Sequence, residues 1–61
     1  MTIIDQMVDL NMKMNNVDPA TATAVDREKA LKRCEACADA LGEPLEVVAS
    51  SYVAHFKSES N

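Results

Sequence analysis

The only glycine of this chain and its two prolines mark the points where regular structure must break. In Leu41-Gly42-Glu43-Pro44, the glycine predicts a helix end because it enters the left-handed conformation easily, and the proline predicts the first turn of a new helix. Asp18-Pro19 predicts a second junction, with Asp18 as an N-cap and Pro19 in the first turn. The sequence therefore predicts one all-α domain, residues 1–61, with three short helices over about 2–16, 19–41 and 44–57. We expect the second and third helices to form a stable hairpin through Gly42, and the N-terminal helix to need a partner.

Each predicted helix carries apolar side chains at helical spacing, which indicates the face that it buries. The first helix has the a/d spacing of a helix laid against another helix, and its stripe is Ile3, Met7, Leu10, Met14 and Val17. The predicted core positions of the second helix are Ala24, Leu31, Cys34, Ala38 and Leu41, flanked by Ala30 and Cys37. Those of the third helix are Leu45, Val48, Ala49, Tyr52 and Phe56. Residues 58–61 are polar, and we expect a loose tail there.

Two Thr-x-x-Asp sequences have the pattern of a capping box, in which the threonine and the acidic side chain each accept a hydrogen bond from the other residue's backbone N–H. Thr2 with Asp5 supports the start of the first helix. Thr23 with Asp26 offers the second helix a start several residues after Pro19. The sequence leaves both starts of the second helix open.

Two polar residues fall within the apolar stripes. Asn11 lies in the middle of the stripe of the first helix; either that part of the helix is exposed, or a buried Asn11 fixes the register between two copies, as polar residues do in coiled coils. Arg27 lies near the centre of the second stripe, so it must either extend to water or meet a carboxylate, with Asp5 and Asp9 as candidates.

The charge balance disfavours two classes of partner. Ten acidic against six basic residues give a net charge of −4, which repels nucleic acid and anionic lipid because both bind through Lys and Arg. We find no signal peptide and no apolar run of the ~18 residues needed to span a membrane. We therefore expect a cytoplasmic protein with reduced thiols.

Few residues suggest catalysis or metal binding. Cys34 and Cys37 form a C-x-x-C, but a structural zinc site needs four ligands, and the chain adds only His55 to the two thiols. Redox cysteine pairs commonly lie at a helix N-terminus, whereas this pair falls in mid-helix and is typical of core packing. His55 lacks a nucleophile elbow nearby, and the single glycine argues against Gly-rich phosphate loops. We predict a protein that is not an enzyme and has no cofactor or metal.

A weak helix-turn-helix pattern spans residues 34–53. Ala38, Gly42 and Val48 stand at positions five, nine and fifteen of that motif. The pattern departs at Glu43 and Ser51, where apolar residues are expected, and the second helix of the motif lacks Arg, Asn and Gln to read base edges. DNA binding through residues 34–53 is therefore the alternative hypothesis rather than the first.

In size, acidity and helical make-up, the chain resembles the short accessory proteins encoded in the early regions of lambda-like temperate phages. That resemblance implies a modulator that binds another protein and alters a developmental choice. From the residues, we predict a homodimer that binds an unidentified protein partner, because the Met-rich stripe of the first helix is broad and adaptable. The residues predicted to form this interface are Ile3, Met7, Leu10, Asn11 and Met14.

Overall fold

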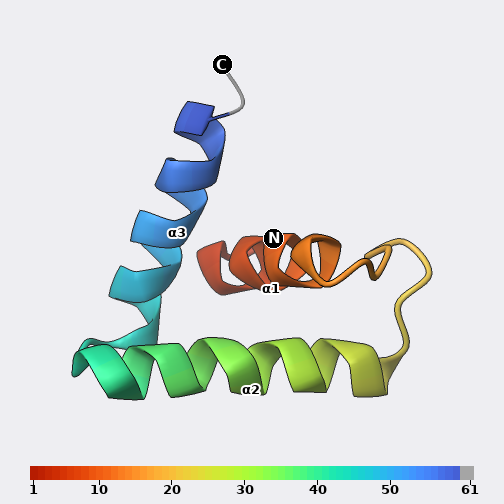
Figure 1. The fold of residues 1–61 in the computed structure, drawn as a ribbon, viewed down its shortest axis with the longest axis horizontal. Coiled ribbons are helices and arrows are strands. Elements are labelled where there is room, and N and C mark those ends of the chain that lie inside the picture. The colour runs from red at the N-terminus through yellow and green to blue at the C-terminus, as the bar shows by residue number, and fades with distance from the viewer. Residues whose placement is uncertain (60–61) are drawn as a thin grey trace.

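The computed structural model describes residues 1–59 and contains three α-helices and, within those residues, no strand. The helices are α1 (Ile3–Met14), α2 (Ala24–Leu41) and α3 (Leu45–Glu59). The predicted all-α fold is confirmed. Helices α2 and α3 form the two arms of an L, and α1 lies in the angle between them (Figure 1).

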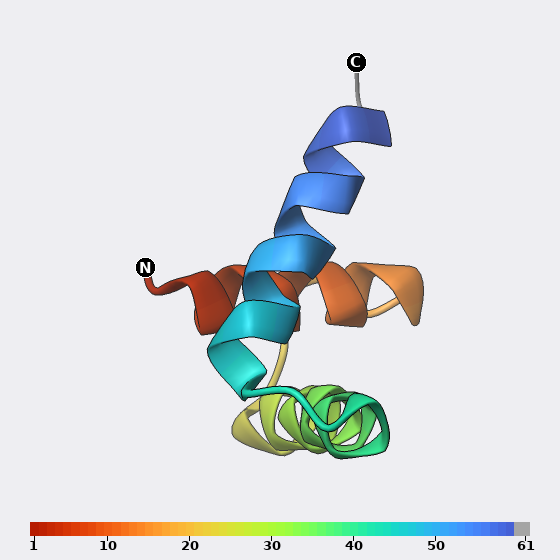
Figure 2. The same ribbon diagram turned by 90° about the vertical axis from the view of Figure 1, so that its left-hand side faces the viewer.

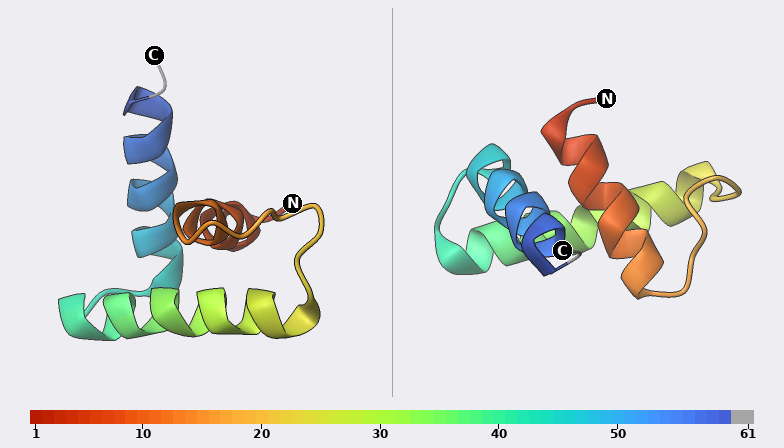
Figure 3. Two further views of the ribbon diagram at one scale, coloured as in Figure 1. Left: turned by 45° about the vertical axis from the view of Figure 1, so that its right-hand side comes forward. Right: turned by 90° about the horizontal axis from the view of Figure 1, so that it is seen from above.

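The core lies around α1, which packs more extensively on α2 and on α3 than these two pack on each other. Figures 2 and 3 show α1 and α3 on the same side of α2, with α2 running beneath both. The buried side chains come from all three helices and are Met7, Val8, Met12, Ala30, Cys34, Ala38, Val48, Ala49 and Val53. The first helix is therefore the centre of the subunit rather than an appendage to a hairpin of the other two.

Both capping boxes are present. The Thr2 hydroxyl accepts from the N–H of Asp5 at 3.1 Å, and the Asp5 carboxylate accepts from the N–H of Thr2 at 3.2 Å. Thr23 and Asp26 make the same pair of bonds, each at 3.1 Å. The second of the two proposed starts of α2 is thus the one adopted.

The predicted helix start at Pro19 is wrong. The Asp18 carboxylate accepts from the N–H of Ala20 at 2.9 Å, and the backbone carbonyl of Asp18 accepts from the N–H of Thr21 at 3.1 Å. These two bonds close an isolated turn. The turn does not continue because the capping box at Thr23 offers two bonds to a helix that begins one residue later. The first helix also ends early, at Met14, since Asn16 takes a left-handed conformation with φ 61°.

The turn at Gly42 forms as predicted. Gly42 has φ 69°, and the N–H of Glu43 bonds back to the carbonyl of Ala38 at 3.1 Å, which satisfies the end of α2. The carbonyl of Pro44 accepts from the N–H of Val48 at 3.2 Å in the first turn of α3. Helix α3 continues through Glu59, so the predicted tail is helical over its first two residues, and residues 60–61 lie outside the described part.

The apolar stripes are confirmed for α3 and partly for α2. All five predicted α3 positions are buried or half-buried. In α2, Ala30 replaces Ala24 in the core, and Leu41 is 63% exposed because neither α1 nor α3 covers that end of the helix. No helix of the described residues is long and apolar enough to cross a membrane.

Candidate protein-interaction surface

The apolar residues predicted to form an interface on α1 are largely used within the subunit. Met7 is only 1% exposed and belongs to the core between α1, α2 and α3. Ile3 and Leu10 are half-buried and pack against the same core. Their role in association stays a prediction, but the folded chain offers a partner no usable surface at Met7.

The other two predicted interface residues bond to neighbouring helices. The Asn11 side-chain oxygen accepts from Nε of Arg33 in α2 at 2.8 Å. The sulfur of Met14 accepts from the Tyr52 hydroxyl of α3 at 2.9 Å, while 59% of the Met14 side chain stays exposed. Asn11 thus links two helices of one subunit, a role that differs from both interpretations drawn from the sequence.

Arg27 meets Asp9, one of the two carboxylates predicted for it. The guanidinium donates to the Asp9 carboxylate at 3.1 Å and to the carbonyl of Pro19 at 3.3 Å. These bonds tie α1 and the connection before α2 to the first turn of α2. Since the Arg27 side chain is 44% exposed, we assign the pair a positioning role and less than about 1 kcal/mol.

The two cysteines occupy different environments. Cys34 is 3% exposed in the core, and burial raises the pKa of its thiol, which keeps it in the unreactive protonated form. Cys37 is exposed, one turn further along α2. The described residues contain no group of three metal-ligating side chains. Packing therefore accounts for Cys34, and Cys37 contributes to the surface described next.

An open apolar groove lies between the C-terminal end of α2 and α3. Its volume is about 420 Å³, and we call it the α2–α3 groove. Leu41 and Val47, 63% and 49% exposed, lie on either side of the Gly42 turn. The complete lining is Cys37, Leu41, Glu43, Val47, Val48, Ser51, Tyr52 and His55. Exposed apolar side chains that share one hollow are typical of a binding surface.

The groove lies in the acidic part of the chain. Between Cys34 and Phe56 there are four carboxylates and no lysine or arginine; the carboxylates are Glu35, Asp39, Glu43 and Glu46. Residues 1–33 carry five acidic and five basic side chains, so the net charge of −4 falls entirely within residues 34–61. A ligand of the groove therefore meets a negative potential.

The helix-turn-helix pattern correctly predicts the turn at Gly42 but not the open groove beside it. Ala38 and Val48 are buried, at 4% and 8% exposure, and Gly42 is left-handed, as the motif requires. Glu43 and Ser51 line the open groove instead of entering the core. Polar residues at these two positions, where the motif expects apolar ones, indicate that the α2–α3 groove stays open to solvent. The sequence pattern did not predict that Leu41 and Val47 line this groove.

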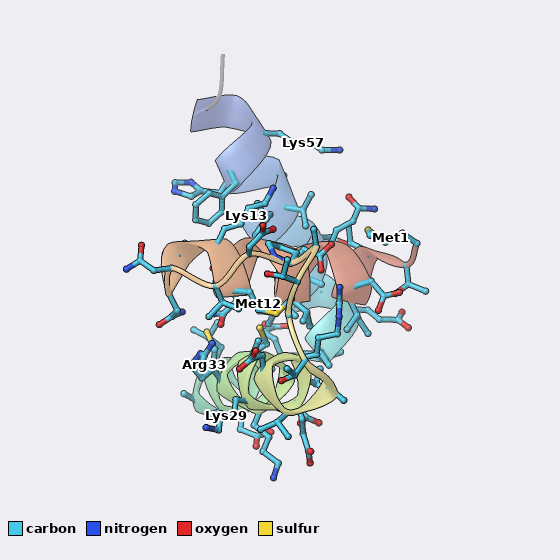
Figure 4. The ribbon with its side chains drawn as sticks, turned by 90° about the vertical axis from the view of Figure 1, so that its right-hand side faces the viewer. Met1, Met12, Lys13, Lys29, Arg33 and Lys57 are labelled. Carbon is cyan, nitrogen blue, oxygen red and sulfur yellow. The ribbon has the colours of Figure 1, made fainter. Side chains whose placement is uncertain are left out.

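A second, smaller hollow of about 240 Å³ lies between α1 and α3. Leu10 and Phe56 contribute apolar surface to it, and Lys13 and Lys57 bring basic groups from the two helices. Figure 4 shows Lys13 on α1 and Lys57 above it on α3. Leu10 is the one predicted interface residue that reaches such a hollow.

Comparison with known proteins gives no relative: no family model, no curated protein and no solved structure matches this chain.

Proposed function

We propose that this chain is a non-enzymatic interaction protein that binds a helical segment of another protein in the α2–α3 groove. The observation that carries the proposal is the exposure of Leu41 and Val47 at one hollow. Burying these two side chains against a partner removes apolar surface from water, which favours association. Val48 and Tyr52 supply the apolar floor on which a partner side chain would rest.

The shape and charge of the groove indicate what kind of segment fits. An amphipathic helix lays apolar residues, three or four positions apart, into a groove of this kind. Glu43, the carboxylate in the groove lining, and the net charge of −4 over residues 34–61 favour lysine or arginine beside those apolar residues. A phage regulatory protein of the class that the sequence resembles would act in this way, by occupying a segment of a protein that controls development.

Photocrosslinking tests the proposal. A photoreactive side chain placed at position 41 or 47 should crosslink the full-length chain to one and the same protein in the cells that produce it. Leu41→Glu should abolish this crosslink from position 47. Val25→Glu is the matched control, because Val25 is 58% exposed against 63% for Leu41 but lies in the first turn of α2, at the opposite end of that helix from the groove.

The two variants separate the groove from the rest of the exposed apolar surface. Loss of the partner with Leu41→Glu but not with Val25→Glu supports the groove. Loss with Val25→Glu alone would transfer the binding site away from the groove and overturn the proposal. Both variants must keep the helical circular dichroism of the parent chain, which their exposed positions favour.

DNA binding through residues 34–53 is the second candidate, favoured by the bend at Gly42 alone. The four carboxylates of this region oppose it. Retention of the chain on duplex DNA at low salt, where electrostatic binding is strongest, would revive this candidate.

A further inference from the structure

The outward face of α2 is uncovered along the whole helix. In Figures 1 and 2 both other helices lie on one side of α2, and no part of residues 1–59 covers the opposite side. Figure 4 shows Lys29 pointing from this face away from the rest of the molecule. Its residues are exposed, and in helical order they are Lys29, Lys32, Ala36, Asp39 and Ala40.

The charges on this face oppose the dipole of their own helix. A helix favours cations near its C-terminus and anions near its N-terminus, yet the last turn of α2 carries Asp39 and no basic residue. Glu35, one turn before Asp39 on α2, carries the same charge and repels it. The isolated chain therefore leaves the last turn of α2 without a compensating cation.

A second copy supplies that cation by symmetry. Lys32 and Asp39 are seven residues apart, which places them on the same edge of α2 about 10 Å apart along its axis. A two-fold axis perpendicular to α2, near Ala36, brings Lys32 of each copy against Asp39 of the other. Ala36 and Ala40 have small side chains that let the two helices approach. A parallel arrangement would instead bring Lys32 against Lys32.

We propose that the chain forms a homodimer through antiparallel pairing of the outward faces of α2, held in register by two symmetry-related Lys32–Asp39 ion pairs. Helix α1 contributes its apolar stripe inside each subunit. The α2–α3 groove lies on a different face of α2 and stays open in this dimer, so the proposal stands independently of the proposed function.

Charge reversal tests the pairing. The solution mass of the parent chain, by light scattering up to about 1 mM, should rise from monomer towards dimer, because a small interface corresponds to weak affinity. Asp39→Lys turns two attractions into two repulsions and should weaken dimerisation roughly tenfold or more. The double variant Lys32→Glu/Asp39→Lys restores both intersubunit pairs with reversed sign and should recover dimerisation. Because Lys32 also lies 3.5 Å from Glu28 of its own helix, this variant replaces that exposed pair by two like charges, and its circular dichroism must match that of the parent.

A mixture of the two single variants gives an independent reading. Chains with Lys32→Glu and chains with Asp39→Lys should each stay largely monomeric but form heterodimers together, since every pair is then opposite in charge. Asp39→Lys should also raise the thermal stability of the monomer, because it places a cation in the last turn of α2. Loss of the dimer therefore cannot be attributed to unfolding.

Glu46→Lys is the matched control, with the same change of charge on exposed surface of α3; it should leave the dimer intact. A parent chain that stays monomeric throughout the concentration range would overturn the proposal. So would dimerisation that survives Asp39→Lys, or a double variant that fails to recover it.

Discussion

Replacing Gly42 by alanine tests how the chain makes the corner between α2 and α3. Gly42 has φ 69°, and a Cβ atom built there meets no atom within 4 Å. Contacts therefore contribute nothing to the effect, and the penalty is conformational. The left-handed region costs a non-glycine residue about 1–2 kcal/mol. The lower entropy of unfolded alanine returns about 0.4–1 kcal/mol. We expect a net loss of about 1 kcal/mol in the free energy of unfolding.

Urea and thermal unfolding measure this loss. In a domain of this size, a change of 1 kcal/mol lowers Tm by about 4–8 °C. Gly42→Asn is the control, because asparagine occupies the left-handed region more readily than alanine, and it should lose about half as much. An alanine variant as stable as the parent, or an asparagine variant as destabilised as the alanine one, would refute the conformational explanation. A loss above about 3 kcal/mol would show that side-chain contacts contribute after all.

Three further predictions concern single side chains. Met12→Ala should lower the free energy of unfolding by about 2–5 kcal/mol, because Met12 is fully buried, whereas Met14→Ala at an exposed position should change it by less than about 1 kcal/mol in the same urea titration. Thr23→Ala removes one bond of a capping box and should cost about 1 kcal/mol, with helix loss visible by circular dichroism. Iodoacetamide at pH 8 should label Cys37 rapidly and Cys34 slowly, by mass spectrometry after proteolysis. Equal labelling rates would contradict the burial of Cys34. Because burial raises the pKa of the Cys34 thiol, its contribution to stability should be complete below the ordinary thiol pKa of 9.0 and decline as the pH rises above it, which urea unfolding on either side of that pH measures.

The local signals in the sequence predicted the helices well. Gly42 and Pro44 each act within one turn of the backbone, so their effect needs no knowledge of the rest of the fold. The start of α2 was harder, since Asp18-Pro19 and Thr23 offered competing starts. In the structure, the Asp18 carboxylate accepts a hydrogen bond within an isolated turn, while Thr23 and Asp26 form the capping box at the start of α2.

The candidate surface could not be predicted in the same way. Helical periodicity shows which way Leu41 points but not whether another helix extends far enough to cover it. For the same reason, the stripe containing Met7 could not be assigned to an intrasubunit core or to an interface. Both depend on contacts between residues distant in the sequence, which only the packed arrangement of α1 against α2 and α3 decides.

The central place of α1 also bears on how the chain folds. Its most extensive packing is with α3, the last helix, so the core cluster around Met7 forms only when the two ends of the chain meet. Bringing α1 and α3 together closes a long loop, which costs conformational entropy before any contact between these helices can form. The adjacent pair α1 and α2 encloses Val8, Met12 and Ala30, whereas the larger cluster around Met7 draws on all three helices. We therefore expect a fragment without α3 to keep only the smaller cluster and to lose most of its stability.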